Sequence, residues 1–141
     1  MLKLLIVEDE ASARKELRYL IEEASSSVER LQIWEAKNGR EALEIVAEYD
    51  IDAAFIDINL GDVKGTNLAQ ELVQFRKNLK IVFATAYDKY AVEAFELNAL
   101  DYILKPFEPE RVRLALTRIE SSCANPEETR DKISRIAGEI R

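Results

Sequence analysis

Short runs of apolar residues alternate along the chain with longer segments in which apolar positions recur every three to four residues. Such short runs are typical of β-strands, and five of them occur, at residues 2–7, 31–36, 53–57, 79–84 and 100–104. The run at 53–57 is apolar throughout until it ends in Asp57. A nearly continuous apolar run predicts a strand that is buried on both faces of a parallel sheet.

The segments between these runs have the apolar spacing of amphipathic helices. They predict helices at residues 11–24, from Asn38-Gly39 onward, and at 65–77, 87–98 and 108–122. Strands that alternate with helices in this way require right-handed crossovers and a parallel sheet. The predicted fold is therefore α/β, a doubly wound five-stranded parallel sheet with five helices.

The last part of the chain carries one more amphipathic pattern. Asn125 is a favourable N-cap, Pro126 suits the first helical position, and an apolar stripe follows. We therefore expect an extra C-terminal helix at residues 126–141, and we divide the chain into a domain at residues 1–122 and a linker or helical extension at 123–141. The alternative for this last segment is a frayed end of the chain.

Composition narrows the classes of function. The 141 residues are 48% hydrophobic and 33% charged, with a formal net charge of -7, and this acidic balance argues against nucleic-acid binding by this chain alone. The single cysteine, Cys123, allows no internal disulfide and fits the cytoplasm, and no apolar stretch is long enough to span a membrane. The chain contains no histidine, which excludes histidine ligands and histidine bases.

Charged and polar residues follow four of the five predicted strands. Glu8 and Asp9 follow the first, Asp57 ends the third, Thr85 follows the fourth and Lys105 follows the fifth. In parallel sheets, binding sites form beyond the carboxyl ends of the strands, so we expect these side chains to converge. Asp52 precedes the third strand and belongs to the opposite edge of the sheet.

The predicted cluster favours a hard cation and phosphoryl chemistry. Several carboxylates without histidine or cysteine favour a metal with oxygen ligands, and Mg²⁺ is the natural choice. A carboxylate beside such an ion can act as a nucleophile toward phosphorus, and Lys105 and Thr85 are placed to meet phosphoryl oxygens. Taken singly, Asp9 is also interpretable as a helix cap, Thr85 as a turn residue and Lys105 as a solvated charge.

These residues, in this order, resemble the receiver domain of bacterial two-component response regulators. The resemblance covers about residues 2–122 and depends on Val7-Glu8-Asp9-Glu10, Phe55-Ile56-Asp57, Gly65, Thr85-Ala86 and Lys105-Pro106-Phe107. The segment from Thr85 to Glu96, together with Ala99 to Tyr102, is similar to the LytTR class, in which a DNA-binding domain follows the receiver. The resemblance implies a flavodoxin-like sheet with strand order 2-1-3-4-5.

The resemblance also implies a role for each site residue. Asp57 would be the phosphoacceptor, and Mg²⁺ would be held by Glu8, Asp9, Asp57 and the backbone carbonyl of Asn59. Lys105 would contact the phosphoryl group, Thr85 would be the switch hydroxyl, and Tyr102 would change rotamer with it. The Lys105-Pro106 bond would be cis. Gly61 stands where many members have proline, and Asp62 adds a negative charge in the loop after Asp57.

The expected function is a cytoplasmic signalling switch rather than an enzyme with turnover. A sensor histidine kinase would supply the phosphoryl group, and the chain would catalyse only its own phosphorylation and dephosphorylation. Phosphorylation would favour a homodimer, with the face of Tyr90, Tyr102 and the 108–122 helix as candidate interface. DNA would be contacted only through an output domain outside this chain, and we expect no contact with a membrane.

Three alternatives remain at this point. A stand-alone or phosphorylation-independent receiver would act as a protein-interaction module. A Mg²⁺-dependent phosphohydrolase of the haloacid-dehalogenase type would need a second acid two residues after the nucleophile, where this chain has Asn59. A flavodoxin-like cofactor module would need a hydroxyl- or glycine-rich loop after the first strand, where acids stand instead.

Overall fold

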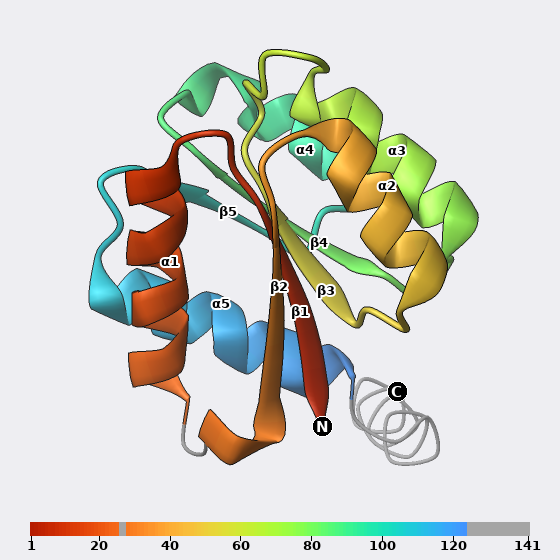
Figure 1. Cartoon of the computed structure of the whole chain (residues 1–141). Coiled ribbons are helices and arrows are strands. Elements are labelled where there is room, and N and C mark those ends of the chain that lie inside the picture. The colour runs from red at the N-terminus through yellow and green to blue at the C-terminus, as the bar shows by residue number, and fades with distance from the viewer. Residues whose placement is uncertain (26–27, 124–141) are drawn as a thin grey trace, which may run out of the picture.

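Five parallel strands form one sheet with the order β2-β1-β3-β4-β5 in the computed structural model, which describes residues 1–25 and 28–123 (Figure 1). The strands are β1 (Leu2–Val7), β2 (Leu31–Ala36), β3 (Ala53–Ile56), β4 (Lys80–Thr85) and β5 (Asp101–Leu104). The strand order and the parallel pairing confirm the predicted fold class. The expected helix at 126–141 lies outside the described residues, and the division at residue 122 stays a prediction.

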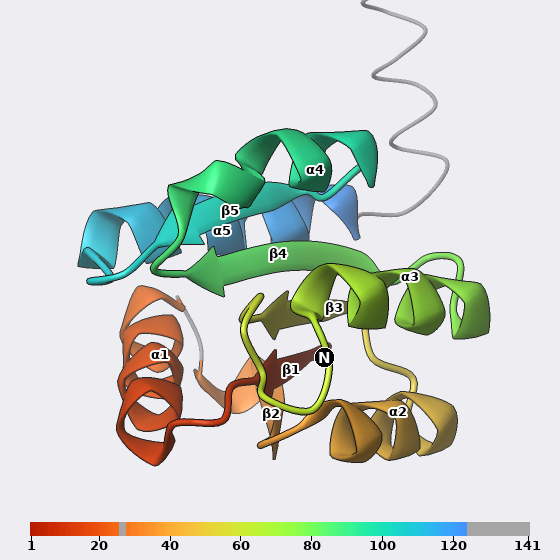
Figure 2. The ribbon, with the colours of Figure 1, turned by 90° about the horizontal axis from the view of Figure 1, so that it is seen from above.

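Helices connect the strands and cover both faces of the sheet (Figure 2). They are α1 (Ala11–Ala24), α2 (Gly39–Glu48), α3 (Gly65–Phe75), α4 (Ala91–Glu96) and α5 (Pro109–Ser122), with 3-10 turns at Val28–Arg30 and Asp88–Tyr90. The residues that α1 and α5 bury form one cluster with the sheet, and those of α2, α3 and α4 form the other. No helix in the described part of the chain combines the length and apolarity that a membrane crossing requires.

The central strands explain the apolar runs in the sequence. Successive side chains of a strand point to opposite faces, so Leu4 and Phe55 pack toward α1 and α5 while Leu5 and Ile56 pack toward α2 and α3. All four residues of β3 are fully buried because helices cover both faces of the sheet. Burial on both faces removes the polar alternation that a half-exposed strand would show.

The helix predicted at residues 87–98 is shorter in the structure. A 3-10 turn at Asp88–Tyr90 precedes the six residues of α4, and Tyr90, the last residue of that turn, has ψ near 3°, outside the α-helical range. The helix ends before Asn98, which has a φ of 59°. Asparagine tolerates this left-handed conformation, which terminates helices. Apolar spacing alone does not reveal this break.

Asp101 is a buried acid that ties β5 to α5. Arg111 donates to both carboxylate oxygens of Asp101, Arg118 lies 2.9 Å away, and the Tyr102 amide donates at 2.8 Å. Burial works to raise the pKa of Asp101, but the Arg111 hydrogen bonds, the Tyr102 amide and the Arg118 charge outweigh it. The pKa of Asp101 therefore lies below its usual value.

Asp101→Asn should destabilise the protein near neutral pH by about 1–3 kcal/mol, because two guanidinium groups lose their buried anionic partner. An acid with a depressed pKa makes its full contribution to the free energy of unfolding above its unfolded-state pKa, about 3.9. This contribution is lost as the pH falls through the folded-state pKa. Urea unfolding at pH 7 and pH 3 measures this effect, and the difference between wild type and variant should shrink at pH 3. An equal difference at both pH values would contradict the assignment.

Candidate functional site

Backbone pairing continues one residue past the strands and fixes the site residues. The Glu8 amide donates to the Ala36 carbonyl and the Asp57 amide donates to the Val7 carbonyl, both at 3.0 Å. Between β4 and β5, the Lys105 amide donates to the Thr85 carbonyl at 2.8 Å. The acid and lysine side chains are therefore held at one edge of the sheet by ladder hydrogen bonds rather than by mobile loops.

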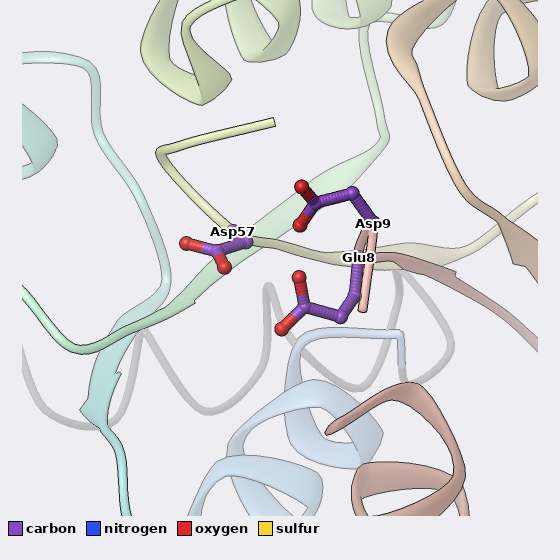
Figure 3. A group of neighbouring side chains, drawn as sticks. All are labelled: Glu8, Asp9 and Asp57. Atoms are coloured by element: carbon purple, nitrogen blue, oxygen red, sulfur yellow. The ribbon is translucent and has the colours of Figure 1, made fainter. Parts of the chain in front are cut away.

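Three carboxylates gather at the ends of β1 and β3 (Figure 3). Oxygen atoms of Glu8, Asp9 and Asp57 all lie within 4.8 Å of one another. Glu8 and Asp57 are only 4% and 7% exposed, whereas Asp9 is exposed. Asp52, at the opposite end of β3, accepts a hydrogen bond from the Lys3 amide at 2.8 Å and stands apart from this cluster, as predicted.

Lys105 supplies the positive charge that balances the cluster. Its ammonium group contacts the Glu8 carboxylate directly and lies 2.9 Å from Oδ2 of Asp57. Burial works to lower the pKa of Lys105, but the hydrogen bonds to Glu8 and Asp57 outweigh it and raise the pKa above its usual value. Lys105 therefore stays charged, and one cation is shared between two buried acids.

Burial is the main reason why the charge of Glu8 is costly at this site. Burial raises the pKa of Glu8 to about 7, against the hydrogen bond from Lys105, and the neighbouring Asp9 and Asp57 add to the rise. A raised carboxyl pKa means that the ionised form is poorly compensated. Three carboxylates against one lysine leave an excess of negative charge, and the all-oxygen donor set suits a hard divalent ion.

The loop after β3 begins with close backbone contacts at Asp57. The Asn59 amide donates to Oδ1 of Asp57 at 3.3 Å, and the Gly65 amide donates to the Ile58 carbonyl at 2.6 Å. A Cβ atom on Gly65 would lie 2.2 Å from the Asp57 carbonyl oxygen. The loop can therefore return to the backbone of Asp57 only because residue 65 has no side chain.

Thr85 and Tyr102 lie on neighbouring strands and both contact the loop after β4. The buried Thr85 hydroxyl accepts a hydrogen bond from the Tyr87 amide at 3.3 Å, and the Tyr102 hydroxyl donates to the Tyr87 carbonyl. The contact of Thr85 with the Tyr87 amide is the one expected if Thr85 is a turn residue, which is the alternative interpretation of Thr85 from the sequence. Burial raises the pKa of the Tyr102 phenol, so this hydroxyl remains a donor at neutral pH. The Lys105-Pro106 bond is cis, as the resemblance implied.

Two contacts at the site were not predicted from the sequence. Arg14 of α1 donates to the Glu8 carbonyl at 2.7 Å and lies 3.3 Å from Glu35. Asp62 accepts hydrogen bonds from the Gly39 amide at the start of α2, and it is not part of the carboxylate cluster. Neither contact leaves a signal in the sequence, because polar positions on a helix or loop are commonly solvated.

The fold and this acidic strand-end site define a class of proteins, the doubly wound α/β domains with a carboxylate cluster and a lysine at the carboxyl ends of their strands. Residues 4–117 match the Response regulator receiver domain family, and the chain belongs to this family. The family assignment confirms the resemblance found in the sequence.

Among the relatives are longer regulators named LytR. The sensory transduction protein LytR of Streptococcus agalactiae is 46% identical over 119 residues, which cover 84% of this chain and 48% of that protein. The transcriptional regulatory protein LytR of Staphylococcus aureus strain MW2 is 41% identical over 133 residues, covering 94% and 53%. The chain thus spans about half the length of these relatives, and their names agree with the LytTR-type resemblance.

Solved structures show the same fold. The response regulatory domain of protein mrkE from Klebsiella pneumoniae matches with a TM-score of 0.77 and 39% identity, covering 86% of this chain and 97% of that one. The response regulator protein TrrA from Thermotoga maritima, solved in complex with Mg²⁺-BeF, matches with a TM-score of 0.74 and 28% identity, covering 84% and 99%.

Lys105→Met should destabilise the metal-free protein by about 1–3 kcal/mol, because it leaves Glu8 and Asp57 without their counter-charge. The same change should let the site bind a divalent cation several-fold more tightly, because the ammonium no longer repels the ion. Thermal unfolding in chelator and calorimetric cation titration measure the two effects. Lys80→Met, at the opposite end of β4, is the control, and equal behaviour of the two variants would contradict the account.

Proposed function

We propose that this chain is the phosphoacceptor unit of a two-component response regulator and that Asp57 accepts a phosphoryl group from the phosphohistidine of a sensor histidine kinase. The observation that carries the proposal is that Lys105 is shared between Glu8 and Asp57 within a group of three carboxylates. A nucleophile, a charge-neutralising lysine and a cation site are the components that phosphoryl transfer requires.

The cation in this proposal is Mg²⁺. The side chains of Glu8, Asp9 and Asp57, with the backbone carbonyl of Asn59, would hold it. When bound, it would neutralise charge on the phosphoryl oxygens and on the attacking carboxylate. The carboxylate donor set supports this choice, as does the Mg²⁺ in the Thermotoga maritima TrrA complex.

Each residue of the chain has a defined part in the transfer. An Asp57 oxygen forms a bond to phosphorus while the bond between phosphorus and the donor nitrogen breaks, and the leaving imidazole takes a proton. Lys105 moves from the Glu8 and Asp57 carboxylates to a phosphoryl oxygen as a point charge. Thr85 exchanges its bond from the Tyr87 amide for one to the phosphoryl group, so the loop after β4 and Tyr102 move with it. Chemistry ends at this self-modification and its reversal by hydrolysis.

An open hollow beside the site supports access for a donor. It has a volume of about 460 Å³ and lies between the loops that follow β3 and β4. Asn59 and Lys64 line one side, and Tyr87, Lys89 and Tyr90 line the other. The lining also includes the acid Asp62, and Lys64 is paired with Glu93, so Lys89 is the lysine whose charge favours an incoming phosphoryl group.

The output of the switch would lie outside this chain. In this proposal, phosphorylation shifts a pre-existing equilibrium toward an arrangement of α4, β5 and α5 that forms a homodimer in the cytoplasm. A LytTR-type domain in the longer protein would then bind DNA and control transcription. The names of the LytR relatives support the transcriptional role, and the chain itself carries an excess of negative charge.

Incubation of the wild type with a small-molecule phosphodonor and Mg²⁺ should add the mass of one phosphoryl group, and Asp57→Asn should abolish the gain. Asp52→Asn is the matched control at the other end of β3 and should retain it. Intact mass spectrometry makes the measurement. No gain in a wild type that binds Mg²⁺ would remove the phosphoacceptor role and leave a phosphorylation-independent interaction module.

Exposed apolar side chains support the proposed dimer face. Phe95 on α4 is 82% exposed, and Leu104 on β5 and Leu114 on α5 are each 45% exposed. The helices α4 and α5 flank β5 at this edge of the sheet (Figure 2). Tyr102 belongs to β5, and Tyr90 directly precedes α4. Burial of such residues against a second copy would stabilise a dimer by the hydrophobic effect.

Phe95→Asp should abolish phosphorylation-dependent dimerisation without reducing phosphorylation of Asp57, because it places a charge in the apolar interface. Phe75→Asp, at a residue of α3 that is 64% exposed, is the matched control and should dimerise normally. Size-exclusion chromatography of phosphorylated samples distinguishes the two. A dimer that tolerates Phe95→Asp would locate the interface on another surface.

A further inference from the structure

The loop between β3 and α3 is closed at its base and held at its tip. At the base, the Gly65 amide donates to the Ile58 carbonyl at 2.6 Å, and Asn59 pairs with Lys64 in an antiparallel bridge. Gly61, at the tip, has a φ of 83°, which glycine adopts without strain. The loop that carries the Asn59 carbonyl is therefore compact. A contact at its tip can set the orientation of the whole loop.

The start of α2 holds that tip through Asp62. The Gly39 amide lies 3.1 Å from Oδ2 and 3.3 Å from Oδ1 of Asp62. The first amides of a helix have no partner within the helix, and α2 satisfies another one locally, because the Glu41 amide donates to Asn38 at 2.8 Å. The two acceptors thus cap the same helix end, but only Asp62 belongs to the loop beside the site.

The packing at Gly39 shows that the approach of the loop to α2 is close. Gly39 is buried, and a Cβ atom there would lie 2.6 Å from Cγ1 of Val63. A glycine at the first position of α2 therefore lets Val63 and Asp62 reach the helix end. On the other flank, Lys64 lies 3.3 Å from Glu93 and 4.6 Å from the centre of the Tyr90 ring.

We infer that Asp62 is a positioning residue, which anchors the β3–α3 loop to the α2 N-terminus so that the Asn59 carbonyl is aimed at the cation beside Asp57. The inference rests on the proposed function. Asp62 acts through the loop, since it lies outside the carboxylate cluster and its oxygens are hydrogen-bonded to Gly39. A negative charge also suits this position, because it faces the positive end of the α2 dipole.

Asp62→Ala and Asn38→Ala separate positioning from helix capping. Both remove an acceptor from the same helix end, so both should lower the thermal midpoint of the metal-free protein. Only Asp62→Ala should weaken Mg²⁺ binding, by about tenfold, since partners that orient metal ligands contribute on this scale. Isothermal titration calorimetry with MgCl₂ on the full chain measures the affinity.

Two further variants complete the test. Asp62→Asn keeps an acceptor for the Gly39 amide and should recover most of the Mg²⁺ affinity. Gly39→Ala should weaken Mg²⁺ binding although alanine favours the helix, because its Cβ displaces Val63. Amide hydrogen exchange at Gly39 should be slow in wild type and faster in Asp62→Ala.

The outcomes are distinguishable. If the wild type binds Mg²⁺ and Asp62→Ala binds it equally well, or if Asn38→Ala weakens binding as much, the positioning role is wrong while the proposed function stands. If the wild type neither binds Mg²⁺ nor gains a phosphoryl group, the proposed function fails, and this inference fails with it.

Discussion

Repulsion among three carboxylates at one edge of a parallel sheet is the constraint on which the rest of this structure depends. The sheet holds Glu8 and Asp57 next to each other by ladder hydrogen bonds, and burial prevents water from screening them. Lys105 offsets this repulsion only in part, since burial and the neighbouring acids still raise the pKa of Glu8 to about 7. Three carboxylates against one lysine therefore leave an excess of negative charge that a further cation would offset.

The same arrangement connects the site to the β5 edge. Tyr102 belongs to β5, and Lys105 directly follows this strand. The Tyr102 hydroxyl contacts the Tyr87 carbonyl in the loop that follows Thr85. A phosphoryl group that attracted Lys105 and Thr85 would therefore act on β5 and on the loop before α4 together. Because α4 has only six residues and follows a 3-10 turn, we expect it to repack at a small cost in free energy.

Much of the fold follows from the sequence, because strand and helix periodicities leave direct signals. The apolar run of β3 predicted burial on both faces, and parallel topology then brought Glu8, Asp9, Asp57 and Lys105 to one edge. Contacts that depend on the path of a loop left no such signal. The hydrogen bond between Asp62 and Gly39 and the contact of Arg14 with the Glu8 carbonyl belong to this second kind. The break at Tyr90 also left no signal, because it is a local change of backbone conformation within an apolar pattern.

The most direct test of the central claim is to locate the phosphoryl group chemically. Borohydride reduces an aspartyl phosphate to homoserine, so treatment of the phosphorylated chain followed by peptide mapping identifies the modified residue. The account predicts homoserine at position 57 and at no other acid of the cluster. Modification at Glu8, Asp9 or Asp62 with Asp57 unchanged would contradict it, because the proposed nucleophile is the Asp57 carboxylate, which lies 2.9 Å from Lys105 at the end of β3.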